Sequence, residues 1–222
     1  MIYLKSYKIF ESRDNQFFKT KEETKDWLDE VSIGKYTIND DLTVDVDGDV
    51  DLNNKKLEKI PVKFKSIGGY FNCGSNQLTS LEGCPKSVGG HFNCNSNKLT
   101  SLDGSPESVG GHFYCNSNKL TSLDGSPDSV GGHFYCRYNQ LTNLDGSPES
   151  VGGSFYCDHN PIEEVYNLFN NKECVKWLNE YGVIRGDKII LNNFKEVVYM
   201  MDMEHTFNYK KLYQLKNYKI SE

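Results

Sequence analysis

Five cysteines of this chain are evenly spaced, and a row of thiols is a candidate for metal or redox chemistry. They lie 21 residues apart, at Cys73, Cys94, Cys115, Cys136 and Cys157. Zinc and iron sites usually draw their sulfur ligands from paired C-x-x-C motifs, which bring four of them to one ion. The chain has no such pair, so the row is typical of small core residues that stay reduced. Cys84 and Cys174 break the spacing, have no base nearby in sequence and are assigned no role.

Histidines and aspartates offer two further candidates for metal binding. His91, His112 and His133 share the 21-residue spacing, and on neighbouring strands their imidazoles would stand about 5 Å apart. A zinc pair is conceivable, but a surface ladder explains the same spacing. The alternating Val-Asp run over residues 44–51 lacks the spacing of calcium loops and favours a solvated strand face. The sequence therefore predicts no metal site and no cofactor.

Motifs of the common catalytic sites are also missing. No Ser-His-Asp, Walker or dinucleotide-binding glycine pattern occurs. We therefore expect no catalytic residues and a protein that is not an enzyme.

The elements that carry these residues form a repeat. One unit, residues 110–130, reads GGHFYCNSNKLTSLDGSPDSV, in which Phe113 and Cys115 alternate with polar neighbours, as in a half-buried strand. Stacked units predict a leucine-rich-repeat-like solenoid, with a parallel sheet of about six short strands on a concave face. A degenerate first coil begins near Val50, and the last is truncated near Asn160. The glycine pair before each strand suits positive φ or close backbone approach, and an inward Asn118 can satisfy backbone groups at the turn.

The ends of the chain read as caps. Residues 20–30 predict an amphipathic helix with a capping box, and residues 36–38 and 42–46 predict a hairpin. Helices are expected over residues 162–169, 173–181 and 194–203, around a strand at 189–191. The predicted organisation is an N-terminal arm, helix and hairpin cap (1–48), a solenoid (49–160), and a mainly helical C-terminal cap with a basic tail (161–222).

Charge and composition argue against several classes of protein. The 222-residue chain has net charge −6, and residues 39–51 hold six aspartates without a base, which leaves a neutral remainder. Nucleic acid is therefore an improbable partner, because phosphate binding needs a basic face. No apolar run is long enough for a signal peptide or a membrane span, so we expect a cytoplasmic protein.

The repeat resembles two groups of known proteins. The pattern N-x-L-T-S-L, followed by a proline turn and a strand, is similar to the short leucine-rich repeats of secreted bacterial effectors. The runs YTIND (36–40), VDVDGDV (44–50) and LTSLEGCPKSVGG (78–90) look more closely like repeat proteins of large tailed bacteriophages, over roughly residues 24–200. That resemblance implies a phage setting and the host cytoplasm, but no particular activity. The effectors' ubiquitin-ligase domain, with its catalytic cysteine, has no counterpart here.

Outward positions of the predicted strands differ from coil to coil. Aromatic and charged side chains concentrate in the last three coils, and tyrosine and arginine are the residues that most often carry interface energy. A stacked tyrosine row could also serve packing alone. The candidate binding residues are Tyr114, Tyr135, Tyr156, Arg137, Tyr138, His112, His133, Asp158 and His159.

These observations predict a non-catalytic protein-interaction module that blocks or recruits a host or phage protein. A virion or head-assembly component is the alternative, since Ile9-Phe10-Glu11 resembles the I-x-E site cleaved by head-maturation proteases of large phages. The basic, aromatic segment over residues 209–219 is either a docked strand or a tail, and as a tail it could contact nucleic acid. The sequence names neither the partner nor the oligomeric state.

Overall fold

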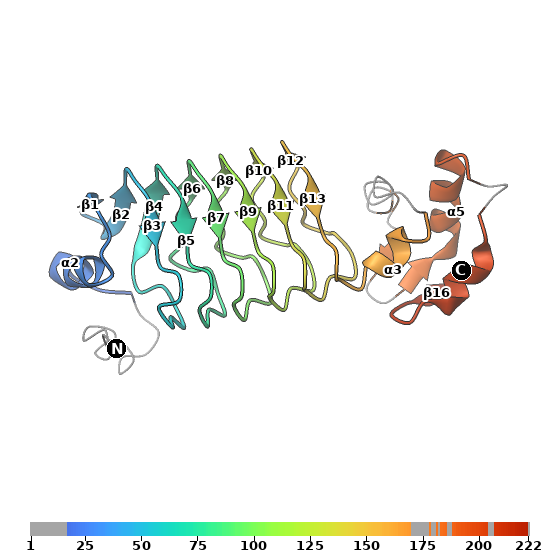
Figure 1. Cartoon of the computed structure of the whole chain (residues 1–222), viewed down its shortest axis with the longest axis horizontal. Helices are drawn as coiled ribbons and strands as arrows, with labels where there is room; N and C mark the ends of the chain where they lie inside the picture. The colour runs from blue at the N-terminus through green and yellow to red at the C-terminus, as the bar shows by residue number, and fades with distance from the viewer. Residues whose placement is uncertain are drawn as a thin grey trace.

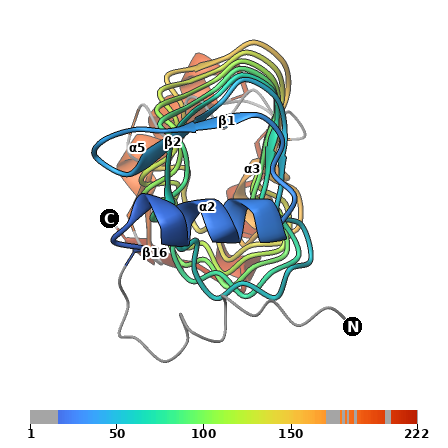
Figure 2. The same ribbon diagram turned by 90° about the vertical axis from the view of Figure 1, so that its left-hand side faces the viewer.

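The computed structural model of the chain is a row of stacked coils that leads into a separate C-terminal group of elements (Figure 1). It describes residues 17–169, 178, 181, 183–185, 188–203 and 207–221. The coils follow one another in a nearly straight line, and they superimpose closely when viewed along the stack (Figure 2).

Each repeat contributes one short strand to each of two sheets. The six-stranded sheet has the order β13-β11-β9-β7-β5-β3, and all of its neighbouring strands are parallel. We number the coils one to six after its strands, which are β3 (Val50–Asp51), β5 (Phe71–Asn72), β7 (Phe92–Asn93), β9 (Phe113–Tyr114), β11 (Phe134–Tyr135) and β13 (Phe155–Tyr156). This sheet confirms the predicted parallel sheet of about six short strands.

A second sheet of seven strands was not anticipated. Its order is β1-β2-β4-β6-β8-β10-β12, and its strands are β1 (Tyr36–Ile38), β2 (Thr43–Val46), β4 (Lys63–Ile67), β6 (Ser87–Val88), β8 (Ser108–Val109), β10 (Ser129–Val130) and β12 (Ser150–Val151). A two-residue Ser-Val strand followed by two glycines shows no alternation of its own, so the sequence reads there as part of a turn.

Inward side chains form ladders that run the length of the stack. The rings of Phe113 and Phe134 lie 5.1 Å apart at an interplanar angle of 4°, and the Phe92 and Phe113 rings are similarly stacked. Such small angles mean that successive coils are hardly rotated against one another. The leucines and cysteines of the middle coils are fully buried beside these rings, as the repeat pattern predicted.

Buried asparagines hold the turns together, which confirms the inward position expected for them. Asn118 Oδ1 accepts the backbone N–H of Leu99 at 3.1 Å. Its amide nitrogen donates to the carbonyls of Cys94 at 3.1 Å and Cys115 at 3.2 Å. The same pattern recurs at the other asparagines of this row, so each amide satisfies backbone groups that the turn leaves unpaired.

The glycine pairs allow close approach of the coils. A Cβ on Gly110 would lie 2.2 Å from the carbonyl oxygen of Gly89, so no side chain fits there. Positive φ instead belongs to the glycine of each Asp-Gly-Ser-Pro turn, such as Gly125 at 82°. Of the two roles expected for the pairs, close approach is the one observed.

The N-terminal cap has the predicted form. Helix α2 (Lys21–Glu30) begins after Thr20, whose hydroxyl accepts the Glu23 N–H at 3.1 Å. Strands β1 and β2 pair as an antiparallel hairpin, and β2 continues the seven-stranded sheet through β4. Figure 2 shows α2 and β1 lying across the end of the stack, where Trp27 and Leu28 are fully buried. This cap therefore covers the first coil.

The C-terminal group contains more strand than the mainly helical cap predicted. Helices α3 (Glu163–Tyr166) and α5 (Leu191–Met200) and the 3-10 helix η1 (Tyr209–Gln214) accompany a three-stranded sheet of β14 (Ile184–Arg185), β15 (Lys188–Ile190) and β16 (Lys219–Ser221). Strand β15 corresponds to the strand expected at 189–191, whereas β14 has only two residues and was not expected. The helix expected over residues 173–181 falls almost wholly outside the described residues.

The basic segment over residues 209–219 is docked rather than a free tail, but it is mostly the 3-10 helix η1, and β16 begins only at its last residue. Strand β16 pairs in parallel with β15, and the Tyr218 hydroxyl donates to the Thr142 carbonyl at 2.8 Å. Burial raises the pKa of that phenol well above its ordinary value. Glu164 accepts the Lys216 backbone N–H at 2.9 Å and the Asn217 amide at 2.8 Å. The Tyr218 bond fastens the C-terminal group to coil five, and the Glu164 bonds hold the segment against α3 within that group.

Candidate binding surface on the six-stranded sheet

Three tyrosines from consecutive strands form a stack on the outer side of the six-stranded sheet. The Tyr114 and Tyr135 rings lie 4.8 Å apart at 9°, and the Tyr135 and Tyr156 rings lie 4.8 Å apart at 10°. All three side chains are half-buried. We call this set the tyrosine stack. Because each ring face is turned toward the next ring, the ring edges and hydroxyl groups are the parts presented outward.

A parallel row of imidazoles lies beside the tyrosine stack. The His91 and His112 rings are 4.5 Å apart and the His112 and His133 rings are 4.8 Å apart, both pairs stacked. We call these three side chains the histidine row. Its imidazoles meet the tyrosines edge to face, with His112 5.8 Å from Tyr114 and His133 5.8 Å from Tyr156 between ring centroids.

Each imidazole of the row joins its own coil to the next. The Nδ1 atoms of His91 and His112 accept the backbone N–H groups of His112 and His133, each at 2.8 Å. His133 Nδ1 likewise accepts the Ser154 N–H at 2.7 Å. In coil one the same contact is made by the Asp49 carboxylate, which accepts the Tyr70 N–H at 2.9 Å. The histidine row therefore has a structural role, because its hydrogen bonds join neighbouring coils, and it also has an exposed edge.

These hydrogen bonds determine which ring nitrogen holds the proton in each neutral imidazole of the histidine row. A ring nitrogen that accepts an N–H carries no proton, so each neutral imidazole holds its proton on Nε2. Burial, followed by the neighbouring His91 and His133, lowers the pKa of His112 below its ordinary value. Zinc would need the unprotonated Nε2 and would displace this arrangement. Within the described residues, no group of three or more His, Cys, Asp or Glu side chains could hold a metal ion.

A second row of side chains makes the same kind of bond in coils three and four. Asn95 Oδ1 accepts the Asn116 backbone N–H at 2.6 Å, and Asn116 Oδ1 accepts the Arg137 N–H at 2.8 Å. Arg137 occupies the next position of this row, and a guanidinium group has no acceptor atom. The amide row therefore ends at Arg137.

Arg137 contacts the last coil instead. Its guanidinium carbon lies 4.7 Å from the ring centroid of Tyr156, and its Nε lies 2.8 Å from Asp158 Oδ2. The contact is an ion pair by distance, although the Nε–H is not aligned for a hydrogen bond. The Arg137 side chain remains 38% exposed, so its charge is still available at the surface.

Tyr138 and His159 occupy a backbone position that disfavours them. The corresponding residues of earlier coils, Ser75, Ser96 and Ser117, have φ between 53° and 56°, and Tyr138 and His159 have φ of 56° and 60°. This left-handed region is uncommon for a non-glycine residue and is an outlier for a bulky one. The two rings stack with centroids 4.2 Å apart, and Tyr138 is 55% exposed. Little of their surface serves the core.

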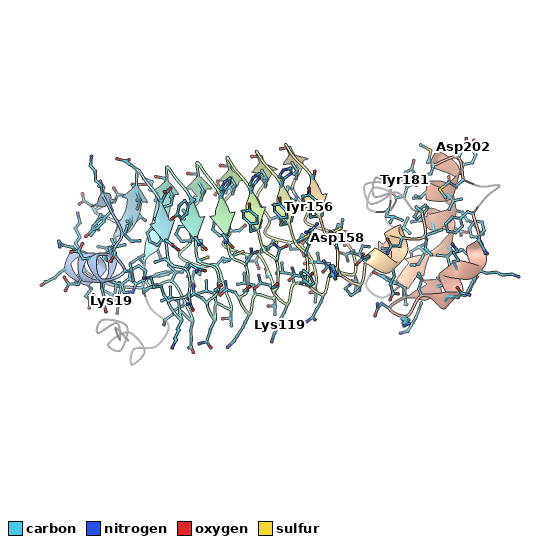
Figure 3. All side chains as sticks on the ribbon, viewed as in Figure 1. Lys19, Lys119, Tyr156, Asp158, Tyr181 and Asp202 are labelled. Atoms are coloured by element: carbon cyan, nitrogen blue, oxygen red, sulfur yellow. The ribbon has the colours of Figure 1, made fainter. Side chains whose placement is uncertain are left out.

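The nine predicted binding residues thus form one connected surface. Ring contacts and one ion pair join seven of them, namely His112, His133, the three tyrosines of the stack, Arg137 and Asp158. Tyr138 and His159 follow directly on the same coils. Figure 3 shows Tyr156 and Asp158 near the end of the stack. We call this connected surface the late-coil surface: Tyr114, Tyr135, Tyr156, Arg137, Tyr138, His112, His133, Asp158 and His159. Sequence reasoning missed the acceptor roles of His91, Asn95 and Asn116. The available signal was the 21-residue spacing within each row, from His91 to His112 and from Asn95 to Asn116.

The late-coil surface lies on the six-stranded sheet. An open groove lies on the other sheet, along the seven-stranded side, where it is lined by Ile67 and the Ser-Val-Gly triplets of the following coils. The side chains there are small, so they leave the backbone in a trough.

The thiols of the cysteine row are buried and have the properties of core side chains. The thiols of Cys94, Cys115 and Cys136 are fully buried and donate to backbone carbonyls of the next coil at 3.3 to 3.4 Å. Burial raises the pKa of each of these thiols well above its ordinary value. Cys84 is buried too, and Cys174 lies outside the described residues.

Together these features define a parallel-strand β-solenoid of the leucine-rich-repeat-like type, with a 21-residue coil. No family model matches the chain, and no curated protein or solved structure matches it either. None of the helices in the described part of the chain is long and apolar enough to cross a membrane.

Proposed function

We propose that this protein is a non-catalytic interaction module that binds a protein partner through the late-coil surface. The proposal rests on one observation: at two outward positions, coils five and six replace the small residues that coils two to four carry, which are Gly74 and Ser75, Asn95 and Ser96, and Asn116 and Ser117. Arg137 ends a row of amide acceptors, and Tyr138 and His159 replace serines at left-handed backbone positions. Residues that break a local rule without helping the core are expected at functional sites.

The residue types at these positions suit a protein interface. Tyrosine and arginine bury a large area at low entropic cost and keep a polar end that can hydrogen-bond. Arg137 is held in place by Tyr156 and Asp158 before any partner arrives. A preordered side chain loses less freedom on binding, which favours affinity.

The orientation of the tyrosine stack favours a protein over a nucleic acid. Single-stranded nucleic acids bind to exposed aromatic ring faces flanked by basic residues. In the tyrosine stack, neighbouring rings cover one another's faces at 4.8 Å, and Arg137 is the only basic residue of the late-coil surface apart from histidine. Ring edges and hydroxyl groups suit the amides, carbonyls and side chains of a polypeptide.

The biological setting of the proposal comes from the repeat itself. The likeness of the chain to repeat proteins of large tailed phages supports a phage-encoded protein that acts in the host cytoplasm, where it blocks or recruits a host or phage protein. A virion component would be expected to present the same surface to another particle protein, so finding the partner distinguishes these settings.

Site-specific photo-cross-linking tests the proposal. A benzophenone amino acid is placed at Tyr138 and, as a matched control, at Ser75, which has the same left-handed backbone position in coil two. We expect the Tyr138 probe to capture a protein in infected-cell extract, in a nuclease-resistant product that the Ser75 probe does not give. Equal capture from both positions, or a product lost on nuclease treatment, would contradict the proposal.

A further inference from the structure

The histidine row lies against the tyrosine stack and is built to work without a positive charge. Each of its three Nδ1 atoms accepts a backbone N–H of the next coil, at 2.7 to 2.8 Å. Protonation of an imidazole places a proton on that nitrogen, so two N–H groups then face each other. A protonated row therefore loses the hydrogen bonds that join coils three to six along this line.

We propose that the histidine row makes the late-coil surface acid-sensitive: protonation of the row separates the coils beneath the tyrosine stack and releases the partner. Only the last step rests on the proposed function. The earlier steps concern the fold and can be measured without a partner.

Repulsion within the row adds to the lost hydrogen bonds. The ring centroids are 4.5 and 4.8 Å apart, so two protonated neighbours would hold like charges at close range. Movement of the imidazoles would also shift the tyrosine stack, because the ring centroids of His112 and His133 lie 6.2 and 5.9 Å from that of Tyr135.

The groups around the row do not neutralise this charge. On the side of the tyrosine stack the row meets aromatic rings, and beyond the stack Arg137 and Asp158 pair with each other. Asp49 occupies the same line in coil one, with Tyr70 of coil two between it and His91. The ion pairs found within the described residues join no carboxylate to the histidine row.

The direction of the pH dependence follows from His112. Its pKa in the folded protein is lowered from the ordinary 6.5 by burial and by the two neighbouring histidines. The unfolded chain therefore takes up a proton more readily than the folded one. Stability is fully present above the ordinary pKa and is lost as the pH falls from there toward the folded-state pKa.

The test compares the full chain with the triple variant His91→Asn, His112→Asn and His133→Asn. An asparagine oxygen can accept the same backbone N–H, as the Asp49 carboxylate does in this row, but it does not titrate. Thermal unfolding is followed at about pH 7.5 and about pH 5. We expect the parent to lose at least about 5 °C more than the triple variant. His159→Asn, outside the row, serves as the control and should behave like the parent.

Nitrogen NMR of the imidazoles provides the second readout, with protons on Nε2 at neutral pH and a depressed titration for His112. Equal pH profiles of parent and triple variant, or protons on Nδ1, would overturn the proposal. A different result would show that the proposed function is wrong. In that case the pH profiles of parent and triple variant differ as expected, but Tyr135→Ala leaves the affinity for the partner unchanged.

Discussion

The guanidinium carbon of Arg137 lies 4.7 Å from the ring centroid of Tyr156 in the next coil, at the end of the tyrosine stack. This contact links two features of the late-coil surface, the stack and the charged pair with Asp158. Cation–π contacts of this kind contribute about 0.5 to 1 kcal/mol at exposed sites. Such a contact orders a side chain more than it stabilises a fold.

The buried asparagine ladder should be a main determinant of stability. Asn118→Ala removes the acceptor for Leu99 and both donors to the cysteine carbonyls. We expect the free energy of unfolding in urea to fall by about 2 to 4 kcal/mol, because buried backbone groups lose their partners. Lys119→Ala, an exposed neighbour in the same turn, should change it by less than about 0.5 kcal/mol. Equal effects would show that the ladder is dispensable.

The cysteine row should behave as inert core. Cys115→Ala is expected to cost about 1 to 2 kcal/mol of unfolding free energy through lost packing, with partner binding intact. Because burial raises the pKa of the Cys115 and Cys136 thiols, alkylation at neutral pH should reach them only in denaturant. Rapid labelling of the native protein, or stoichiometric zinc or iron after purification, would refute this interpretation.

The N-terminal cap should be required for a monodisperse protein. Removal of residues 1–46 uncovers the apolar end of the first coil, including Val50, Leu52 and Phe64, which are at most 3% exposed in the intact chain. We expect aggregation in size-exclusion chromatography with light scattering, since solenoids need polar terminal elements. A truncated chain that stays monomeric and unfolds cooperatively would show that α2 and the hairpin are appendages.

The repeat made the inward half of this fold predictable from sequence. Phe113 and Asn118 recur at the same 21-residue spacing, and residues that recur in this way pack inward against those of the next coil. The strand at Ser108–Val109 could not be recognised, because two residues before a glycine pair carry no periodic signal. The nine surface residues were found by their change from coil to coil. The acceptor role of His112 was hidden, since its partner lies 21 residues away and depends on strand register.

The proposed function depends on the residues that change at positions 137 and 138. Restoring the residues of the preceding coil at these positions tests it most directly. The double variant Arg137→Asn and Tyr138→Ser carries the residues of the preceding coil, Asn116 and Ser117. It regains an amide acceptor and relieves the left-handed tyrosine, at the loss of one partly exposed ion pair and two aromatic contacts. The unfolding free energy should therefore stay within about 1 kcal/mol of the parent.

The decisive measurement is the affinity of this double variant for the partner captured at Tyr138, determined by calorimetry alongside the parent chain and Ser75→Ala. The account predicts at least tenfold weaker binding by the double variant, equivalent to about 1.4 kcal/mol, with folding preserved and Ser75→Ala close to the parent. Unchanged affinity, or a loss of affinity matched by a loss of several kcal/mol in stability, would contradict it.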